Sequence, residues 1–390
     1  MGKFIRIGIV GTVGLPACYG GFETLAQNLV KQLSNKYDLT VYCSGKKYPS
    51  KNRLTYFNGA KLRYLPLKAN GVQSILYDLI SMIHAMFTQD LILVLGVSGC
   101  AFIPVLKFFT RKKFLVNIDG LEWRRDKWRP WVQSFLKFSE AMAVKYADGV
   151  VADNQAIRDY VMEEYGVDAH LASYGGDQAQ REPIELETIS QYPFLKGRYF
   201  FKVCRIEPEN NVEMILEGFA RYPKYPFVLV GNWNHSEFGR KLKQTYEGYN
   251  HIYLYDPIYD PKTLGMLRSN AWVYIHGHSA GGTNPSLVEA MNLNLPILAY
   301  DVNYNRETTE GKGIYFGDAF QLFSKLQELN EPARQELGRK MGEIAKRRYT
   351  WKVISEQYDV MFGLYKIGNY EKETISLDNQ PSLVEPVVMG

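Results

Sequence analysis

Residues 272–291 read WVYIHGHSAGGTNPSLVEAM and contain the unit from which the fold can be inferred. The apolar run over 272–276 predicts a buried strand, and the apolar spacing after Pro285 predicts a helix over 286–292. A glycine-rich loop joins the two elements. A buried strand that enters a helix through such a loop is typical of a doubly wound α/β sheet with parallel strands.

The amino-terminal region has the same unit, FIRIGIVGTVGLPACYGGFE, over residues 4–23. It predicts a strand over 4–10 and a helix over 21–37. The glycines do not form G-x-G-x-x-G, and no acidic residue follows the second strand to bind a ribose, so a dinucleotide site is not indicated. Two interpretations stay open: Gly20 and Gly21 let backbone N–H groups approach a phosphate, or the glycines only form a turn.

Strands and helices alternate along the rest of the chain. Further strands are expected at 39–43, 61–67, 91–97, 114–118, 149–152, 169–173, 199–206, 227–230, 251–255, 296–300 and 313–316. Helices are expected at 72–87, 131–146, 155–165, 212–222, 236–247, 261–270 and 318–329, with one long helical tail from Pro332 to about Ile367.

The acidic stretch 176–196 contains two prolines and interrupts this alternation. Because 390 residues exceed one ordinary domain of roughly 100–200 residues, we predict two domains. The predicted division is a first Rossmann-like domain over 1–178, a linker over 179–196, a second Rossmann-like domain over 197–345, a helix over 346–368 and a disordered tail over 369–390.

Composition narrows the functional class. The net charge is only +5, and no nucleic-acid motif accompanies the basic residues, so we predict no nucleic-acid partner. The four cysteines lack C-x-x-C spacing, which argues against a zinc site and fits a reducing cytoplasm. The longest apolar stretch, Leu91–Leu106, is shorter than the ~20 residues that span a bilayer, so no transmembrane helix is expected.

The loop after the strand at 272–276 could hold a diphosphate. Gly282, Thr283 and Asn284 lead into the helix and offer free N–H groups and a hydroxyl to an anion. Glu289 stands among apolar residues of that helix and is placed to accept hydrogen bonds from ribose hydroxyls. A buried carboxylate needs a partner, which favours a functional role over a solvated surface position.

This loop and helix resemble the donor-binding motif of family 4 glycosyltransferases, which have the GT-B fold. In that family two acidic residues are separated by seven others; Glu289 matches the second, whereas Gly281 stands at the first. The resemblance implies a donor sugar with fewer hydrogen-bonding groups, such as a deoxysugar. A family Arg–Lys pair that contacts the donor phosphates is represented by Arg205, with Asn210 in place of the lysine.

Two further motifs resemble a subgroup described mostly as bacterial rhamnosyltransferases of surface polysaccharide assembly. They are YGGFETL at 19–25 and NIDGLEW at 117–123. The resemblance implies transfer of L-rhamnose from dTDP-L-rhamnose, without metal or other cofactor, to a lipid-linked saccharide. It also implies that the first domain binds the acceptor, that the second binds the nucleotide sugar, and that the helix at 346–368 crosses back to the first domain.

Asp119 ends a predicted strand and precedes a glycine, so we expect its carboxylate to face the cleft as the catalytic base for the acceptor hydroxyl. The alternative role is a turn cap. Glu122, Trp123 and Arg125 would then lie on the acceptor side, with the tryptophan stacking on a sugar ring.

Basic and aromatic residues alternate over 108–113 and 123–131. Between residues 101 and 150, ten Lys or Arg stand against five Asp or Glu. This pattern favours contact with the inner face of the cytoplasmic membrane, because cations attract anionic headgroups and aromatic rings prefer the interface. A solvated face without a partner is the alternative.

Two other functions compete with glycosyl transfer. A nucleotide-sugar epimerase of similar architecture would need no acceptor and no basic membrane-facing patch. A non-catalytic member of a polysaccharide assembly complex would tolerate Gly281 and Asn210 in place of the family's acidic and lysine residues.

Overall fold

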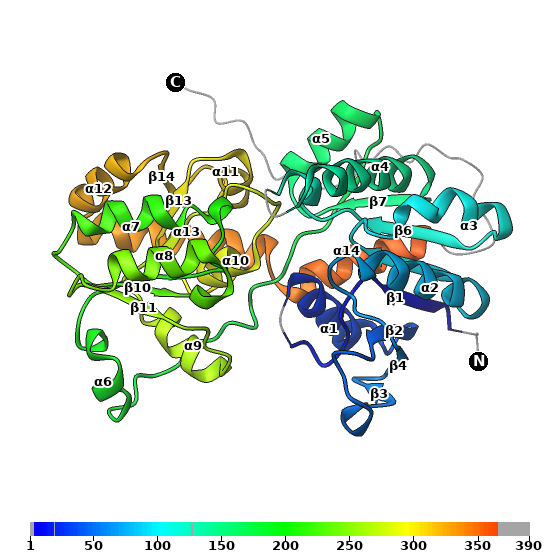
Figure 1. The fold of residues 1–390 in the computed structure, drawn as a ribbon, viewed down its shortest axis with the longest axis horizontal. Helices are drawn as coiled ribbons and strands as arrows, with labels where there is room; N and C mark the ends of the chain where they lie inside the picture. The colour runs from blue at the N-terminus through cyan, green and yellow to red at the C-terminus, as the bar shows by residue number, and fades with distance from the viewer. Residues whose placement is uncertain (1–3, 19, 126–127, 366–390) are drawn as a thin grey trace.

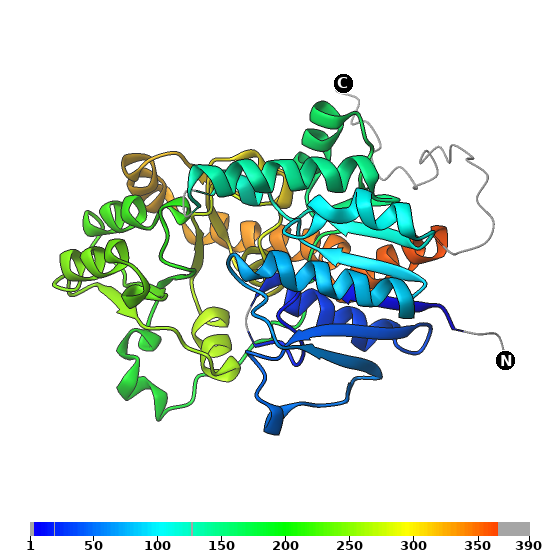
Figure 2. The ribbon, with the colours of Figure 1, turned by 45° about the vertical axis from the view of Figure 1, so that its right-hand side comes forward.

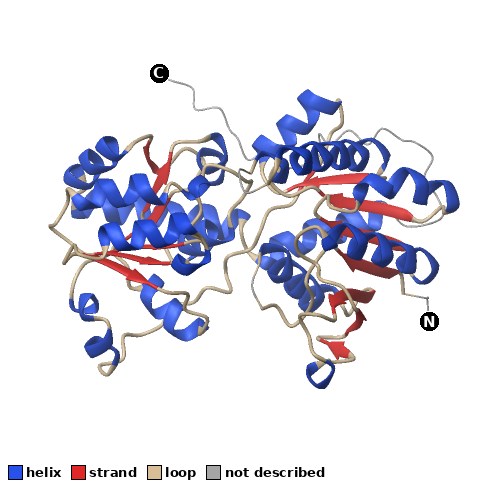
Figure 3. Cartoon of the chain, in the orientation of Figure 1, coloured by secondary structure: helices blue, strands red, loops and turns tan. Residues whose placement is uncertain are grey.

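A computed structural model describes residues 4–18, 20–125 and 128–365 of the chain. In these ranges two sheets, each with helices on both faces, form two domains side by side (Figures 1 and 3). The predicted doubly wound α/β architecture is therefore confirmed. Tyr19, Asp126, Lys127 and the tail predicted to be disordered lie outside the described residues.

The first domain contains a described sheet of eight strands in the order β3-β4-β2-β1-β5-β6-β7-β8. Neighbouring strands pair in parallel except β3 with β4. The strands are β1 (Arg6–Val10), β2 (Asp38–Ser44), β3 (Tyr56–Phe57), β4 (Ala60–Leu65), β5 (Leu91–Leu95), β6 (Lys113–Asn117), β7 (Gly149–Ala152) and β8 (His170–Leu171). The helices are α1 (Gly21–Leu33), α2 (Gln73–Thr88), α3 (Ile103–Phe109), α4 (Pro130–Tyr146) and α5 (Gln155–Tyr165).

The second domain contains six described strands in the order β11-β10-β9-β12-β13-β14, all paired in parallel. These are β9 (Phe200–Val203), β10 (Phe227–Val230), β11 (Ile252–Tyr255), β12 (Val273–His276), β13 (Ile297–Tyr300) and β14 (Ile314–Phe316). The helices that follow the first domain are α6 (Thr188–Gln191), α7 (Val212–Ala220), α8 (Glu237–Tyr246), α9 (Pro261–Ser269), α10 (Pro285–Asn292), α11 (Asn303–Thr308), α12 (Ala319–Glu328), α13 (Glu331–Arg348) and α14 (Trp351–Leu364).

Alternate residues of β5 show how the first sheet is covered. Ile92 and Val94 pack in the cluster formed with α2, α3, α4 and α5, whereas Leu93 and Leu95 pack in the cluster that includes α1 and α14. Helices α2, α3 and α4 therefore share one face of the sheet, and Figure 2 shows them side by side in light blue, cyan and green.

The carboxyl-terminal helix crosses back to the first domain, as the resemblance implied. Helix α14 packs against α1, and the Lys36 ammonium lies 2.6 Å from a carboxylate oxygen of Asp359. The prediction of one uninterrupted helix from Pro332 was wrong, because the chain leaves the helix at Tyr349 and Thr350. The Tyr349 side chain is buried with its hydroxyl on the Thr308 carbonyl, and the Thr350 hydroxyl caps the next helix.

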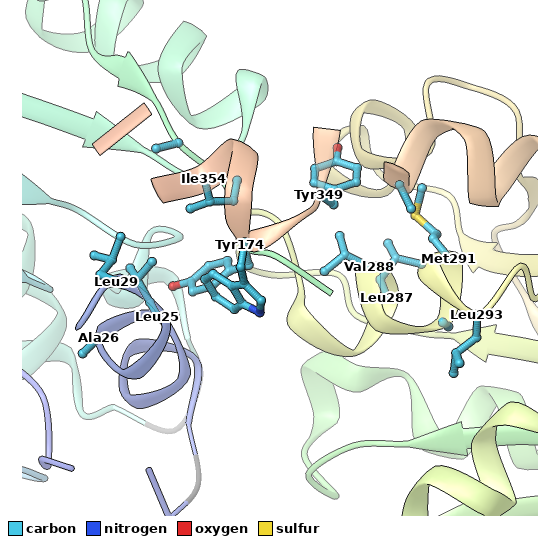
Figure 4. Close-up of a cluster of buried hydrophobic side chains, with 14 of the residues drawn as sticks. Leu25, Ala26, Leu29, Tyr174, Leu287, Val288, Met291, Leu293, Tyr349 and Ile354 are labelled. Atoms are coloured by element: carbon cyan, nitrogen blue, oxygen red, sulfur yellow. The ribbon is translucent and has the colours of Figure 1, made fainter. Parts of the chain in front are cut away.

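Apolar side chains of both domains pack on this crossing segment. Figure 4 shows Leu25 and Leu29 of the first domain on one side of Ile354 and Tyr349, and Leu287 of the second domain on the other. The two domains therefore share one buried cluster.

Three short helices were not predicted, namely α3, α11 and α6, which lies in the predicted linker. Helix α3 lies in the segment whose apolar character drew attention to membrane spanning, and α11 begins after Val302, which provides no side-chain cap. Among the described helices, none has both the length and the apolar character needed to cross a membrane.

Candidate active site between the two domains

A cavity of about 340 Å³ opens between the domains. The first domain contributes Leu121 and Arg124. The second contributes Pro208, Glu209, Ser279, Ala280, Gly281 and Tyr304. Most of these residues follow β6, β9 or β12, so the cavity lies at the carboxyl ends of parallel strands, where doubly wound folds bind their ligands.

The predicted catalytic residue lies beside the predicted donor loop. A Cβ atom on Gly120 would lie 2.3 Å from the Gly282 nitrogen, so the two loops touch and only glycine fits there. Asp119 comes directly before this contact and has a φ of +58°. Its N–H donates to the side-chain oxygen of Asn117 over 3.0 Å, and Asn117 in turn donates to the Tyr358 hydroxyl of the crossing helix.

Asp153 forms a second contact between the domains that the sequence analysis missed. A Cβ atom on Gly282 would lie 1.8 Å from Asp153 Oδ1. Burial and the nearby charge of Asp119 raise the pKa of Asp153 well above its usual value. The available signal was its position, since it follows the buried strand β7 at the same sheet edge as Asp119.

Thr283 has a different role from the one predicted. Its side chain is buried, and the hydroxyl donates to the Asp153 carbonyl oxygen over 2.6 Å. The hydroxyl therefore joins the two domains and is not presented to a diphosphate. Asn284 caps α10, with its side-chain oxygen accepting from the Ser286 N–H over 3.1 Å.

Glu289 has its partner inside the protein. Its carboxylate forms an ion pair with the buried Arg268 guanidinium of α9 and accepts from the Gln178 side chain over 2.7 Å. Arg268 supplies a counter-charge, so the partial burial of this carboxylate does not by itself call for a ligand, and the predicted contact of Glu289 with a ribose stays a prediction.

Arg205 follows β9, three residues before the cavity-lining Pro208, and keeps 39% of its side chain exposed. Its guanidinium forms an ion pair with Glu207 at 3.6 Å, and the exposed part of the group stays open to a ligand. Asn210 turns inward instead: it is buried, and its amide donates to the Arg205 carbonyl over 2.7 Å.

The glycine-rich loop of the first domain already contains an anion. The buried Glu23 carboxylate accepts from the Val13 N–H over 2.7 Å and from the Thr12 hydroxyl over 3.1 Å. Gly20 has a φ of +133°, and a Cβ atom there would lie 1.9 Å from Glu23 Oε2. Gly21 packs at ordinary distance against Tyr174. A diphosphate at Gly20 and Gly21 would have to compete with this carboxylate.

The residues predicted for the acceptor side do lie near the cavity, but not with the predicted contacts. The Trp123 indole N–H donates to the buried Glu140 carboxylate over 3.1 Å, and the Lys137 ammonium lies 4.7 Å from the ring centroid. These contacts anchor the tryptophan in the loop, and its stacking on an acceptor sugar stays a prediction.

Arg125 pairs with Glu122 over 2.8 Å. Burial disfavours the charged guanidinium, but surrounding carboxylates outweigh this and raise the pKa of Arg125. The carboxylates belong to Glu122, Asp119, Glu209 and Glu207. Arg125 therefore lies in the field of acidic groups from both domains.

Within the described ranges, no three His, Cys, Asp or Glu side chains are grouped so that they could hold a metal ion. His276 and His278 are neighbours, with ring centroids 4.5 Å apart and nearly parallel planes.

Comparisons with solved structures agree with this arrangement. Sucrose-phosphate synthase from Thermosynechococcus elongatus superposes with a TM-score of 0.76 at 15% identity, over 92% of this chain and 98% of that chain. The Anabaena protein HepE in complex with UDP-glucose gives 0.72 at 12% identity, over 93% and 100%. The chain has the GT-B fold. A glycosyltransferase from Rickettsia africae has this fold too, with a TM-score of 0.69 at 12% identity over 95% and 100%.

Sequence families divide this GT-B chain in the same way. Residues 187–347 match the family "Glycosyl transferases group 1", and residues 5–177 match "Domain of unknown function (DUF1972)". No curated protein matches the chain. Together the family match and the GT-B fold support a glycosyltransferase; the rhamnosyltransferase subgroup stays a prediction.

Proposed function

We propose that this protein transfers L-rhamnose from dTDP-L-rhamnose to a lipid-linked saccharide in bacterial surface polysaccharide biosynthesis. The observation that carries the proposal is the cavity where the Asp119–Gly120 loop touches the Gly281–Gly282 loop. This contact places Asp119 of the first domain beside a glycine-rich loop of the second domain. Residues 187–347, which include that loop, match a glycosyl transferase family. Gly281, which lines the cavity without a side chain, is compatible with a deoxysugar.

Each group has a distinct part in this reaction. Arg205 and the backbone N–H groups of the glycine-rich loop that precedes α10 bind the diphosphate. Asp119 accepts the proton of the acceptor hydroxyl, and the oxygen of that hydroxyl forms a bond to the anomeric carbon of the donor sugar. The bond from that carbon to the diphosphate breaks, and dTDP leaves. We propose that no metal or other cofactor takes part.

Exposed apolar side chains support action at a membrane. Helix α2 presents Leu76, Ile80, Ile83 and Phe87 along one side, at helical spacing. Its one charged residue, Asp78, is buried. An uncharged apolar stripe of this length on a surface helix is typical of an interaction site.

The neighbouring helices extend the apolar surface. On α3 and α4 the exposed large apolar residues include Val105, Phe108, Phe109, Trp131 and Phe138. Exposed cations lie on the same elements or the loops between them: Arg111, Arg129 and Lys145. Apolar and aromatic residues bordered by cations suit the surface of an anionic bilayer. We therefore propose peripheral attachment to the inner face of the cytoplasmic membrane, with α2, α3 and α4 in contact with lipid.

The transfer reaction can be tested directly. Purified protein is incubated with radiolabelled dTDP-L-rhamnose, or with UDP-glucose, and with lipid-linked saccharides in vesicles. We expect label in the lipid fraction and release of dTDP only from the rhamnose donor. Transfer of sugar only from UDP-glucose would support a glycosyltransferase but reject rhamnose as the sugar that it transfers.

Two other outcomes identify the competing functions. Conversion of the nucleotide sugar to an isomer without any acceptor would indicate an epimerase. Neither turnover nor nucleotide binding under any condition would indicate a non-catalytic member of an assembly complex.

Membrane contact is tested by co-sedimentation with vesicles of neutral and of anionic lipid. The double variant Leu76→Ser and Phe87→Ser should bind anionic vesicles about tenfold more weakly than wild type, because two large apolar groups no longer enter the interface. Val360→Ser is the matched control, since Val360 is an exposed apolar residue of α14. Equal binding by the double variant and wild type would reject this surface.

A further inference from the structure

A buried lysine lies beneath the loop that lines the cavity. Lys202 is on β9, its side chain is 0% exposed, and its Nζ atom has no hydrogen-bond partner. A Cβ atom on Gly277, the first residue of the loop after β12, would lie 3.0 Å from this Nζ. Burial lowers the pKa of Lys202, and the neighbouring Cys204 side chain only partly opposes this. An ammonium without an anion is strongly unfavourable in a protein interior, so an anion bound nearby would favour the charged form of Lys202.

Two histidines in the same place also have unused hydrogen-bonding atoms. Neither ring nitrogen of the buried His276 has a partner, and neither does Nδ1 of His278. Burial and Lys202 lower the pKa of His276 well below its usual value. Both rings are therefore neutral near pH 7, and each keeps one N–H available to donate.

Positive charges surround His278. Burial lowers the pKa of His278 most, and further lowering comes from His276, Lys202, Arg205 and Arg125. The fields of Lys202, Arg205 and Arg125 thus overlap at this ring, which adjoins the cavity-lining residue Ser279. Glu207 and Glu209 oppose them, and burial raises the pKa of Glu209.

We propose that Lys202 supplies, from beneath the loop, the positive charge for the donor's diphosphate that Asn210 lacks, and that His278 donates to a phosphate oxygen. This proposal rests on the proposed function. Asn210 is buried, and its amide donates to the Arg205 carbonyl. Of the two positions that resemble the family's phosphate-binding pair, only Arg205 therefore carries a positive charge. Lys202 does not line the cavity; it is a positioning residue that acts through its charge and through His278.

The test compares Lys202→Met with wild type, using inorganic pyrophosphate, dTDP and thymidine as ligands in calorimetry and thermal melting. Methionine has nearly the length of lysine and no charge. We expect the dissociation constants of pyrophosphate and dTDP to rise about tenfold or more, with that of thymidine unchanged. The melting temperature without ligand should not fall, because an unpaired buried charge has been removed.

Lys241→Met is the matched control, since Lys241 is an exposed lysine of α8 in the same domain. Pyrophosphate affinity equal to that of wild type in Lys202→Met would overturn the proposal. A lower melting temperature with unchanged affinity would also overturn it and give Lys202 a structural role.

His278→Ala provides a second route should Lys202→Met not fold, because the His278 side chain is only partly buried. It should weaken pyrophosphate and dTDP about tenfold and leave thymidine unchanged; unchanged pyrophosphate binding would contradict the role of this ring. Failure of the two proposals can be told apart. If Lys202→Met loses pyrophosphate binding but the wild type transfers no rhamnose, the proposed anion site is supported and dTDP-L-rhamnose is rejected as the donor. If the wild type transfers rhamnose and Lys202→Met binds pyrophosphate as tightly as the wild type, only the proposed role of Lys202 is rejected.

Discussion

The two glycine-rich loops of this protein occupy equivalent places between a strand and a helix, but their chemistry differs. Each leaves the carboxyl end of a central strand and enters a helix. The loop of the first domain is closed around its own carboxylate, Glu23, which takes the Val13 N–H and the Thr12 hydroxyl. The loop of the second domain borders a cavity, and Lys202, His276 and His278 beneath or within it have polar atoms without partners.

This difference teaches that a glycine-rich loop alone does not identify a phosphate site. What matters is whether the protein has already satisfied the N–H groups and the positive helix end. In the first domain a side chain three residues after Gly20 has done so. In the second domain Asn284 caps the helix, but the side chains of Lys202, His276 and His278 keep polar atoms without partners, and these are left for a ligand.

The largest effect is expected where the first domain meets the second loop. Asp119→Asn keeps the shape of the side chain but cannot accept the acceptor proton. Turnover should fall about 10²- to 10⁴-fold with dTDP binding nearly normal. Steady-state kinetics and calorimetry measure the two quantities. Turnover like that of wild type would remove Asp119 from the chemistry.

A methyl group in the second loop should have the next largest effect. Gly282→Ala places a Cβ atom 1.8 Å from Asp153 Oδ1, so the loop and the first domain must separate. A displacement of about 1 Å can cost about 10²-fold in rate, and we expect kcat/KM for transfer to fall by this order. Gly248→Ala, where the methyl group meets no atom within 4 Å, is the control. Unchanged kinetics in Gly282→Ala would mean that the contact between the loops does not matter.

A substitution in the first loop should lower the stability of the fold without changing the binding of dTDP. Glu23→Ala leaves the Val13 N–H and the Thr12 hydroxyl without their acceptor, which should lower the free energy of unfolding by about 2–3 kcal/mol. Urea unfolding measures this loss. The dissociation constant of dTDP should not change, and a large change at full stability would show that the first loop binds the phosphates.

The smallest effect is expected at the opposite end of the first sheet. Burial disfavours the charged form of Asp148, but hydrogen bonds from Lys107, the Phe114 N–H and Lys113 outweigh it and hold its pKa below the usual value. This carboxylate therefore stabilises the fold above about pH 4, and the contribution is lost as the pH falls through its folded pKa.

Asp148→Asn should lower the free energy of unfolding by up to about 1 kcal/mol at pH 7, and the difference from wild type should shrink between pH 4 and pH 2. Urea unfolding across this range measures it. A difference that stays constant down to pH 2 would show that the charge of Asp148 is not involved. Binding of dTDP at pH 7 should equal that of wild type, which makes this variant a reference for pure loss of stability.

Much of the fold could be predicted because it is encoded locally. Buried strands that alternate with amphipathic helices define the two sheets, and α10 was predicted from Pro285 and its apolar spacing. The break at Tyr349 was missed, although Thr350 followed by a helical pattern is an N-cap signal.

The site could be predicted only in part, because its contacts join residues far apart in the sequence. The position of Asp119 at a strand end was visible, but its approach to the second loop depends on Gly120 meeting Gly282. The pairing of Glu289 with Arg268 could not be seen from the spacing of the helix. Lys202 did leave a signal, a charged residue within an apolar strand, but its lack of a partner is a property of the folded chain.

Hydrogen exchange with and without dTDP distinguishes the two loops in one experiment. The structure predicts that dTDP protects backbone N–H groups over residues 277–286 and leaves residues 11–21 unchanged. Protection confined to residues 11–21 would contradict this assignment, because the phosphates would then lie in the loop that Glu23 already fills.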